Sequence, residues 1–359
     1  MMLGALPPSE GSDASDALRV GAPRGSAWVA CALPATDLAA EGAVAATPAH
    51  SNMARREGLE AAGRIAECTG ARLLCDTFTP RIERGAGLVP VERIPYFAEQ
   101  ATEVLASIDD LILVGSKPPV SFFAYPGRDS WLSPPECTFH VLAHPHEDGV
   151  AALANLADAC GAAAVPALRA PLESNPPGAG DLLNSFTAGQ VLAELLPEGA
   201  IIVDDGATSG IGPYIACGTA APHDYLALTG GSIGIGLPMG VGAAVACPDR
   251  KVVVLEGDGS GMYTAQALWT QARERLDVVN IVFANRSYAI LNLEMQRVGA
   301  DPGKQARAML SLDDPAINWT TLAQSMGVEA SRAETLTELR AQLSSAMNVR
   351  GPRLIEVVV

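Results

Sequence analysis

The feature that most constrains the fold is the run Val252–Leu255, which leads into the turn Gly257-Asp258-Gly259-Ser260. Consecutive branched apolar residues predict a strand buried on both faces, as in a parallel sheet. The two glycines remove side chains where the backbone turns, so a ligand can approach the chain closely. Apolar residues then recur at helical spacing, which predicts a helix over residues 261–275. A helix start beside one carboxylate suits an anion with a metal ion next to it.

Helix and strand patterns alternate along most of the chain. They predict an α/β protein built from two parallel-sheet, Rossmann-like three-layer domains. The segment Pro166–Gly180 is dense in proline and glycine and shows little periodicity, so we interpret it as linker. We expect a disordered tail and the remnant of a preceding domain in residues 1–35, a first α/β domain in 36–165, a linker in 166–184, and a ligand-binding α/β domain in 185–359.

Composition narrows the classes of partner and compartment. The formal net charge of -16 argues against a nucleic-acid or anionic-membrane partner, because binding along phosphates needs clustered lysine and arginine. The seven cysteines are scattered and form no Cys-x-x-Cys pair, which favours a reducing compartment. The first residues have no signal-peptide pattern, and no apolar run is long enough for a membrane span. We therefore expect a cytoplasmic protein.

Polar residues follow three predicted strands, in the segments Asp205–Ser209, Gly257–Ser260 and Ala284–Ser287. In an open parallel sheet, ligands bind outside the carboxyl ends of the strands. Asp258 and Asn285 are separated by one predicted helix and one predicted strand, so we expect their oxygens to lie at adjacent strand ends. A carboxylate, an amide oxygen, a backbone carbonyl and phosphate oxygens form a ligand set suited to Mg²⁺.

At this point a family resemblance emerges. The Gly-Asp-Gly turn, followed one helix and one strand later by Ala284-Asn285, resembles the thiamine-diphosphate signature. The whole stretch Leu228–Ile290 is similar to the cofactor-binding region of the acetolactate synthase and benzoylformate decarboxylase family. Residues 55–165 resemble the middle domain of a subgroup of acetolactate synthase large subunits. The resemblance implies a middle domain followed by a thiamine-diphosphate-binding domain.

The resemblance also implies roles for individual residues. The implied Mg²⁺ ligands are the side chains of Asp258 and Asn285 and the carbonyl of Ser287. The carbonyl of Gly231 would accept a hydrogen bond from the aminopyrimidine, and Ile233 would hold the cofactor in its bent form. The implied wall of the substrate pocket is Tyr288, Ile290 and Leu291. The complete implied cofactor-binding set is Thr208, Ser209, Gly231, Ile233, Gly257, Asp258, Gly259, Ser260, Asn285 and Ser287.

The implied activity is that of a thiamine-diphosphate- and Mg²⁺-dependent carboligase or decarboxylase of 2-oxo acids, a transferase or a lyase. The family has a pyrimidine-binding domain with an activating glutamate, and most of that domain has no counterpart in this sequence. Glu41 lies after the apparent last strand of the domain and is not assigned as that glutamate. We therefore expect a homo-oligomer or a separate chain that supplies the pyrimidine-binding domain. FAD is not expected, because its glycine-rich segment is not evident in Leu38–Arg55.

Alternatives stay open at this point. The chain is either such an enzyme, a truncated non-catalytic fragment that retains the cofactor pocket, or a nicotinamide-dependent oxidoreductase. The glycines of residues 230–236 are only weak support for the oxidoreductase, because their order is not the Gly-x-Gly-x-x-Gly of dinucleotide-binding proteins. The loop around His140, His144, His146, Glu147 and Asp148 is a weak metal candidate. Asp204 and Asp205 are adjacent on a strand and face opposite sides, so we interpret them as shaping a loop.

Overall fold

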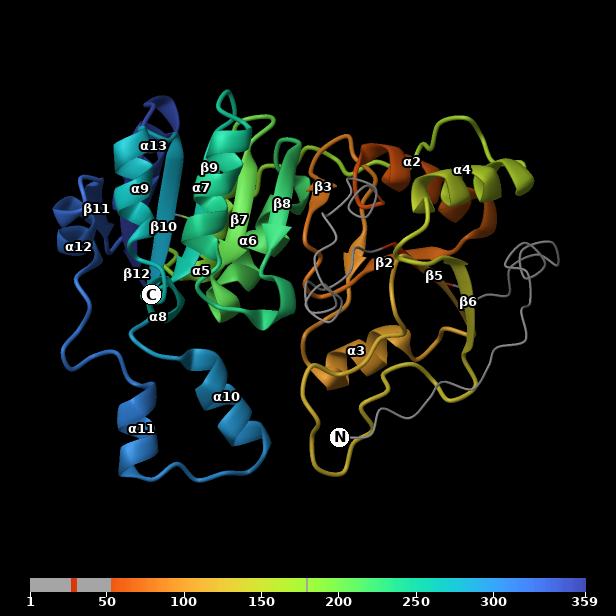
Figure 1. Cartoon of the computed structure of the whole chain (residues 1–359), viewed down its shortest axis with the longest axis horizontal. Coiled ribbons are helices and arrows are strands. Elements are labelled where there is room, and N and C mark those ends of the chain that lie inside the picture. The colour runs from red at the N-terminus through yellow and green to blue at the C-terminus, as the bar shows by residue number, and fades with distance from the viewer. Residues whose placement is uncertain (1–26, 31–52, 179) are drawn as a thin grey trace. The chain divides into compact units, whose positions relative to one another are not determined.

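The computed structural model describes residues 27–30, 53–178 and 180–359, which divide into two units (Figure 1). The first unit contains Ala27–Ala30, residues 53–77 and Val91–Leu168. The second unit contains Phe78–Pro90 and Arg169–Val359. Both units are α/β layers with sheets that are parallel apart from one strand, as the sequence predicts. Within the described residues, no helix combines the length and apolar character that crossing a membrane requires.

The sheet of the first unit has the strand order β4-β2-β1-β5-β6, and all its pairs are parallel. Its strands are β1 (Ala27–Ala30), β2 (Arg72–Cys75), β4 (Glu92–Arg93), β5 (Asp110–Val114) and β6 (Thr138–Ala143). Its helices are α2 (Arg56–Thr69), α3 (Ala98–Leu105) and α4 (Gly149–Ala159). Helix α2 buries an apolar face that includes Leu59 and Ile65, and it ends at Gly70, whose φ of 77° is in the left-handed region.

Strand β1 corrects one expectation. Residues 1–35 are assigned above to a tail and the remnant of a preceding domain. In the structure, Ala27–Ala30 pairs with β2 on one side and β5 on the other, so it is a central strand of the first unit's sheet. Pairing between distant segments decides which sheet a strand joins, and the local sequence pattern does not contain that information.

The sheet of the second unit has the order β11-β12-β10-β9-β7-β8-β3. Its strands are β3 (Ile82–Arg84), β7 (Ile201–Asp205), β8 (His223–Ala227), β9 (Val252–Gly257), β10 (Val278–Ala284), β11 (Glu329–Ala333) and β12 (Arg353–Val358). Strands β9 and β10 are buried on both faces, which explains their largely apolar sequences. All neighbours pair in parallel except β3, which runs antiparallel to β8.

Helices cover both faces of this sheet (Figure 1). The helices of this unit are α5 (Ser185–Leu195), α6 (Ile211–Ala216), α7 (Gly236–Ala246), α8 (Asp258–Gly261), α9 (Ala267–Glu274), α10 (Ala289–Arg297), α11 (Lys304–Leu310), α12 (Trp319–Ser325) and α13 (Leu336–Asn348). Of these, α10 and α11 lie beyond the strand ends and not on a face of the sheet (Figure 1). A continuous core joins the sheet to α7, α9 and α12 through Leu237, Leu268 and Trp319. The helix predicted for residues 261–275 is shorter in the structure, where α9 spans Ala267–Glu274 and the chain turns between Met262 and Gln266.

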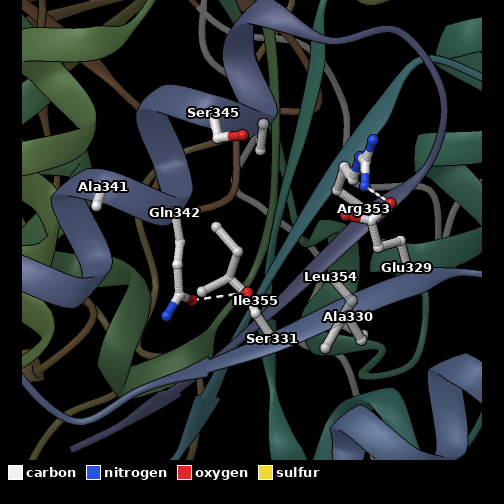
Figure 2. Close-up of a pocket in the computed structure, with 10 residues that line it drawn as sticks. Glu329, Ala330, Ser331, Ala341, Gln342, Ser345, Arg353, Leu354 and Ile355 are labelled. Carbon is white, nitrogen blue, oxygen red and sulfur yellow. Dashed lines mark hydrogen bonds and ion pairs between the residues drawn. The ribbon is translucent and has the colours of Figure 1, made fainter.

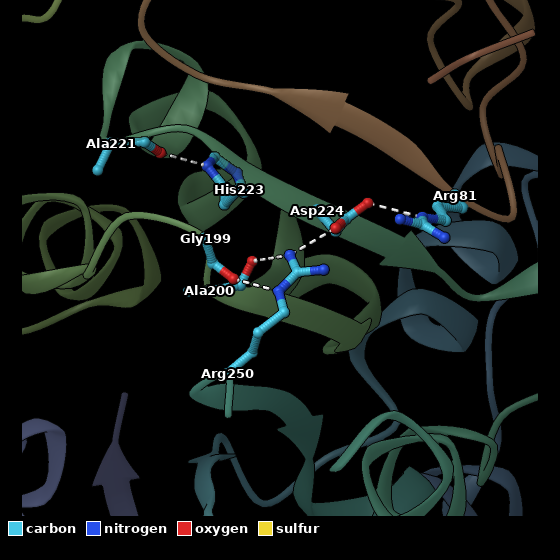
Figure 3. Close-up of polar contacts among 7 residues, drawn as sticks. All are labelled: Arg81, Gly199, Ala200, Ala221, His223, Asp224 and Arg250. Carbon is cyan, nitrogen blue, oxygen red and sulfur yellow. Dashed lines mark hydrogen bonds and ion pairs between the residues drawn. The ribbon is translucent and has the colours of Figure 1, made fainter. Parts of the chain in front are cut away.

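Strand β3 comes from a segment that the sequence assigns to the first domain. Residues Phe78–Pro90 pack in the second unit, where β3 covers the edge of β8. The side chain of Asp224 in β8 accepts hydrogen bonds from Arg81 at 2.6 Å and from Arg250 at 2.5 Å (Figure 3). The two guanidinium groups hold the pKa of Asp224 below its ordinary value, against the effect of burial. This ion-pair cluster therefore holds the inserted edge strand on the sheet.

Part of the expected linker also pairs with the second unit. The N–H of Ala170 donates to the carbonyl of Leu88, and the N–H of Gly87 donates to the carbonyl of Ala170. Further along, the N–H of Glu173 donates to the carbonyl of Thr219. Proline and glycine density predicts irregular backbone, but irregular backbone still forms such hydrogen bonds when it lies against a folded layer.

His223, the residue before Asp224, is expected to make the stability of the fold depend on pH. His223 is buried, its Nδ1 lies 2.8 Å from the carbonyl of Ala221, and burial lowers its pKa from 6.5 to about 4 (Figure 3). The unfolded chain therefore binds a proton on this side chain between pH 6.5 and 4 that the folded chain does not. We expect His223 to cost the folded state about 3 kcal/mol as the pH falls through this window.

The measurement is urea unfolding between pH 7 and pH 4, for the wild type and for His223→Asn, which retains an N–H donor. Asp205 and Asp258, whose pKa values are raised to about 6, titrate in the same window with the opposite sign. The informative quantity is therefore the difference between the two proteins. The free energy of unfolding of the wild type should fall relative to that of the variant as the pH falls. A difference independent of pH would contradict the assignment of a neutral buried histidine.

Candidate cofactor and metal site

Three strand ends meet at one edge of the second sheet. Strands β7, β9 and β10 are neighbours, with β9 in the centre. The backbone N–H of Arg286, after β10, donates to Oδ2 of Asp258, after β9, at 2.6 Å. The hydroxyl of Ser260 donates to the carbonyl of Asp205, at the end of β7, at 3.0 Å. The structure thus brings together the three segments that the sequence predicts at this edge.

Asp258 is 3% exposed, and burial raises its pKa to about 6. The N–H groups of Arg286 and Gly259 act in the opposite direction by donating hydrogen bonds to the carboxylate. Arg286 has a φ of 55°, a region that disfavours residues with side chains, and this conformation accompanies the direct contact of its N–H with Asp258. A buried carboxylate held mainly by backbone dipoles is suited to a cation, which would supply the missing positive charge.

Asn285 directly follows β10, and its Oδ1 accepts a hydrogen bond from the N–H of Ser287 at 3.0 Å. The hydroxyl of Ser287 accepts from the side chain of Asn292 at 2.9 Å and donates to the carbonyl of Leu310 at 3.3 Å. Carboxylate and amide oxygens from adjacent strand ends therefore lie on two loops joined by a hydrogen bond. This is a hard-oxygen donor set of the kind that Mg²⁺ prefers.

The hydroxyl of Ser260 is committed to the protein itself. Its oxygen lies 2.7 Å from Oε1 of Glu256 and accepts from the N–H of Gly257 at 3.2 Å, and the side chain is buried. Because the side chain of Ser260 bonds within the protein, its backbone N–H, at the start of α8, is the group that would bind an anion. Thr208 and Ser209 lie in a short 3-10 helix, Ala207–Gly210, which contacts β9. Thr208 is half-buried and Ser209 is buried.

The glycine loop, residues 229–236, lies beside these segments. Gly230, Gly231 and Gly234 have φ values of 65°, 67° and 91°, a region in which only glycine is unstrained. The hydroxyl of Thr264 donates to the carbonyl of Gly234 at 2.7 Å. Ile233 is 37% exposed, so an apolar side chain projects from this loop toward solvent rather than into the core.

The two adjacent aspartates of β7 have different partners, as expected for successive residues of a strand. Asp204 accepts from the hydroxyl of Tyr225 at 2.6 Å and from the N–H of Gly206 at 3.0 Å. Asp205 accepts from the N–H groups of Gly234 and Gly236 at 2.7 and 3.0 Å. Burial raises the pKa of Asp205 to about 6, against the effect of these two N–H groups. Both carboxylates therefore organise loop backbone.

Tyr288 lies against the Gly-Asp-Gly turn. A Cβ atom at Gly259 would lie 2.6 Å from Cε1 of Tyr288, so the glycine is needed for this close approach. Tyr263, which the sequence analysis does not single out, hydrogen-bonds Tyr288 and contributes to raising its pKa, after burial. Ile290 is half-buried, and Leu291 is 45% exposed, on a helix, α10, that has no buried residue. Of these three predicted pocket residues, Tyr288 is the one that the structure places against the Gly-Asp-Gly turn.

The other predicted residues do not form a site in the described part of the chain. His140 pairs with Asp110 at 2.9 Å, Asp148 caps α4, and the rings of His144 and His146 stack. No group of three or more His, Cys, Asp or Glu side chains with metal-binding geometry occurs among the described residues. Glu41, and residues 38–52 of the segment in which a flavin motif is sought above, lie outside the described residues.

One hollow in the second unit lies away from the candidate site. It has a volume of about 330 Å³ between α13 and the strands β11 and β12 (Figure 2). The side chains of Ser331 and Gln342 hydrogen-bond across it at 2.7 Å, and Arg353 pairs with Glu329. Glu329 and Arg353 are the first residues of their parallel strands, so the hollow adjoins the strand ends opposite to those that carry Asp258.

Comparison with known proteins connects this geometry to a family. Residues 211–357 match the family described as thiamine pyrophosphate enzyme, C-terminal TPP binding domain. A protein of Mycobacterium tuberculosis that carries the name acetolactate synthase large subunit IlvX is 48% identical over 308 residues, which are 85% of this chain and 59% of that protein. Benzoylformate decarboxylase of Pseudomonas aeruginosa is 33% identical over 180 residues, which are 50% of this chain and 33% of that protein.

Solved structures agree on the fold. The thiamine diphosphate-dependent 4-hydroxybenzoylformate decarboxylase of Rhodococcus jostii RHA1 has a TM-score of 0.69 at 21% identity, covering 95% of this chain and 62% of that one. Benzoylformate decarboxylase of Polynucleobacter necessarius has a TM-score of 0.68 at 20% identity, covering 98% and 65%. The chain thus spans less than two thirds of the length of these relatives. It is a homologue of acetolactate synthase large subunits and benzoylformate decarboxylases, and its residues 211–357 match the C-terminal TPP binding domain of thiamine pyrophosphate enzymes.

Proposed function

We propose that the second unit binds thiamine diphosphate together with Mg²⁺, and that the protein acts in the decarboxylation or carboligation of 2-oxo acids. The observation that carries the proposal is the direct hydrogen bond between the loops of Asp258 and Asn285, at the ends of adjacent parallel strands. Both residues lie within the matched TPP binding domain. The oxygens of these two side chains, joined by the carbonyl of Ser287, would hold the metal ion.

The same edge provides groups for the rest of the cofactor. Ser260, at the start of α8, would donate its backbone N–H to the diphosphate, and Thr208 and Ser209 would contact it from the 3-10 helix. Gly259, whose own N–H donates to Asp258, would lie against the diphosphate without a side chain. Gly257 leaves room for this approach. The glycine loop would contact the remaining part of the cofactor through the carbonyl of Gly231 and the side chain of Ile233.

When bound, thiamine diphosphate supplies a nucleophilic carbon and stabilises the negative charge left when a 2-oxo acid loses carbon dioxide. The contribution of this chain is to bind and orient the cofactor and to shape one wall of the substrate pocket with Tyr288, Ile290 and Leu291. Two relatives are named for benzoylformate and 4-hydroxybenzoylformate decarboxylation and one for acetolactate synthesis. We extend their shared substrate class, 2-oxo acids, to this protein. A pyrimidine-binding domain on another chain would complete the site, and FAD is not part of the proposal.

Calorimetric titration of the purified protein with thiamine diphosphate tests the proposal. We expect binding in the presence of Mg²⁺ and loss of binding when the metal is removed by a chelator, because the diphosphate charge then faces buried Asp258 without compensation. NAD⁺ serves as the comparison ligand and should not bind. Equal affinity for thiamine diphosphate with and without Mg²⁺, or binding of NAD⁺ in its place, would overturn the proposal and favour the oxidoreductase alternative.

A further inference from the structure

The carboxylate of Asp205 is the main side-chain anchor of the glycine loop. It is 0% exposed, and one oxygen, Oδ2, accepts from the N–H groups of both Gly234 and Gly236. The second glycine is required by this packing, since a Cβ there would lie 2.4 Å from Oε2 of Glu256 and 2.7 Å from Cβ of Asp205. The loop backbone therefore lies directly on the side chains that end β7 and β9.

The backbone of Asp205 is also fixed by contacts with β9 and Ser260. Its backbone pairs with β9 in register with Glu256, and its carbonyl accepts from the hydroxyl of Ser260 at 3.0 Å. The oxygen of the same hydroxyl lies 2.7 Å from Oε1 of Glu256. The glycine loop is thus connected, through one buried side chain, to the strand end that leads into Asp258.

We propose that Asp205 is a positioning residue for cofactor binding, which fixes the glycine loop so that Gly231 and Ile233 are preorganised for the part of thiamine diphosphate beyond its diphosphate. The inference rests on the proposed function. Glycines at left-handed φ values have large conformational freedom, so a loop that contains three of them stays in one conformation only if other groups hold it. Asp205 supplies two hydrogen bonds to that loop, and Thr264 supplies one more at Gly234.

The geometry gives Asp205 no part in contacting substrate. Its carboxylate is fully buried and directed at backbone N–H groups of the protein. The residue therefore acts through the loop, and its removal should affect ligands that reach the loop more than ligands that occupy only the diphosphate subsite. This distinction separates a positioning role from a general effect on folding.

The experiment compares Mg²⁺-dependent binding of thiamine diphosphate and of inorganic pyrophosphate by the wild type, Asp205→Ala, Asp205→Asn and Asn280→Ala. For Asp205→Ala we expect affinity for thiamine diphosphate to fall by about tenfold or more, with pyrophosphate changed by about twofold or less. Asp205→Asn keeps an acceptor oxygen and should restore most of the affinity. Asn280 is also fully buried in this sheet, but bonds Gln271 and the carbonyl of Arg353, so its variant should leave the ratio of the two affinities unchanged.

A measurement on the cofactor-free wild type keeps the inference testable if Asp205→Ala does not fold. Hydrogen exchange of the Gly234 and Gly236 amides should be as slow as in the adjoining strands. Exchange at the rate of an unstructured peptide, or equal losses for both ligands in Asp205→Ala, would overturn the inference. A wild type that binds neither ligand would contradict the proposed function instead, while the exchange rates would still decide the role of Asp205.

Discussion

Replacing Asp258 with alanine is expected to weaken Mg²⁺-dependent binding of thiamine diphosphate by about 100-fold or more. The change removes a buried carboxylate that would bind the metal directly, and charged interactions of this kind contribute on the order of 3 kcal/mol when desolvated. The diphosphate would then lose most of its counter-charge, because backbone N–H groups alone would face it. Calorimetric titration at fixed Mg²⁺ concentration gives the two dissociation constants.

The folded state itself should tolerate this change. Burial raises the pKa of Asp258, so its charged form destabilises the cofactor-free folded protein at neutral pH. At neutral pH, Asp258→Ala should therefore be at least as stable as the wild type. Asp224→Asn provides the matched control, since it removes a buried carboxylate at the opposite end of a strand in the same sheet. It should lower stability and leave cofactor affinity unchanged. Unaltered affinity in Asp258→Ala would remove Asp258 from the proposed metal site.

The sequence predicts the parts of the site that depend on strand order. Asp258 and Asn285 each follow an apolar run that is buried on both faces, and one helix lies between the runs, so right-handed parallel crossover places the two residues side by side. The structure shows this adjacency in the pairing of β9 with β10 and in the hydrogen bond from Arg286. The alternating helix and strand patterns also predict α/β structure in the first unit, where α2, β2 and β5 lie.

Other features depend on contacts between distant segments, and local pattern does not contain them. Strand β3 pairs with β8 in the second sheet, and Arg81, just before β3, bonds Asp224, which lies 143 positions further along the chain. The helix predicted over residues 261–275 begins only at Ala267, and Thr264, in the turn before it, hydrogen-bonds the glycine loop. Alternation along β7 shows only that Asp204 and Asp205 face opposite sides. Which loop each carboxylate holds depends on tertiary packing.

The purified 359-residue chain, supplied with thiamine diphosphate and Mg²⁺, is expected to decarboxylate pyruvate or an aryl 2-oxo acid at a rate near background. General acid–base catalysis contributes roughly 10²–10⁴-fold to reactions of this kind. The family resemblance assigns that role to a glutamate of the pyrimidine-binding domain, and no residue of this sequence matches it. Asp258, Asn285 and the glycine loop would bind and orient the cofactor, but they include no carboxylic acid positioned to activate it.

Adding a second chain that carries a pyrimidine-binding domain should raise the rate by about the same 10²–10⁴-fold. The assay measures carbon dioxide release and ligated product, first with the chain alone and then with the added chain. The control is the added chain with Asp258→Ala in place of the wild type, which should stay at background because the cofactor is no longer held. Robust turnover by the chain alone would refute the need for a partner, and Glu41 would then be the first acidic residue to replace. If no turnover appears with or without the added chain, although the cofactor binds in the presence of Mg²⁺, the protein would instead be a cofactor-binding protein without catalytic activity.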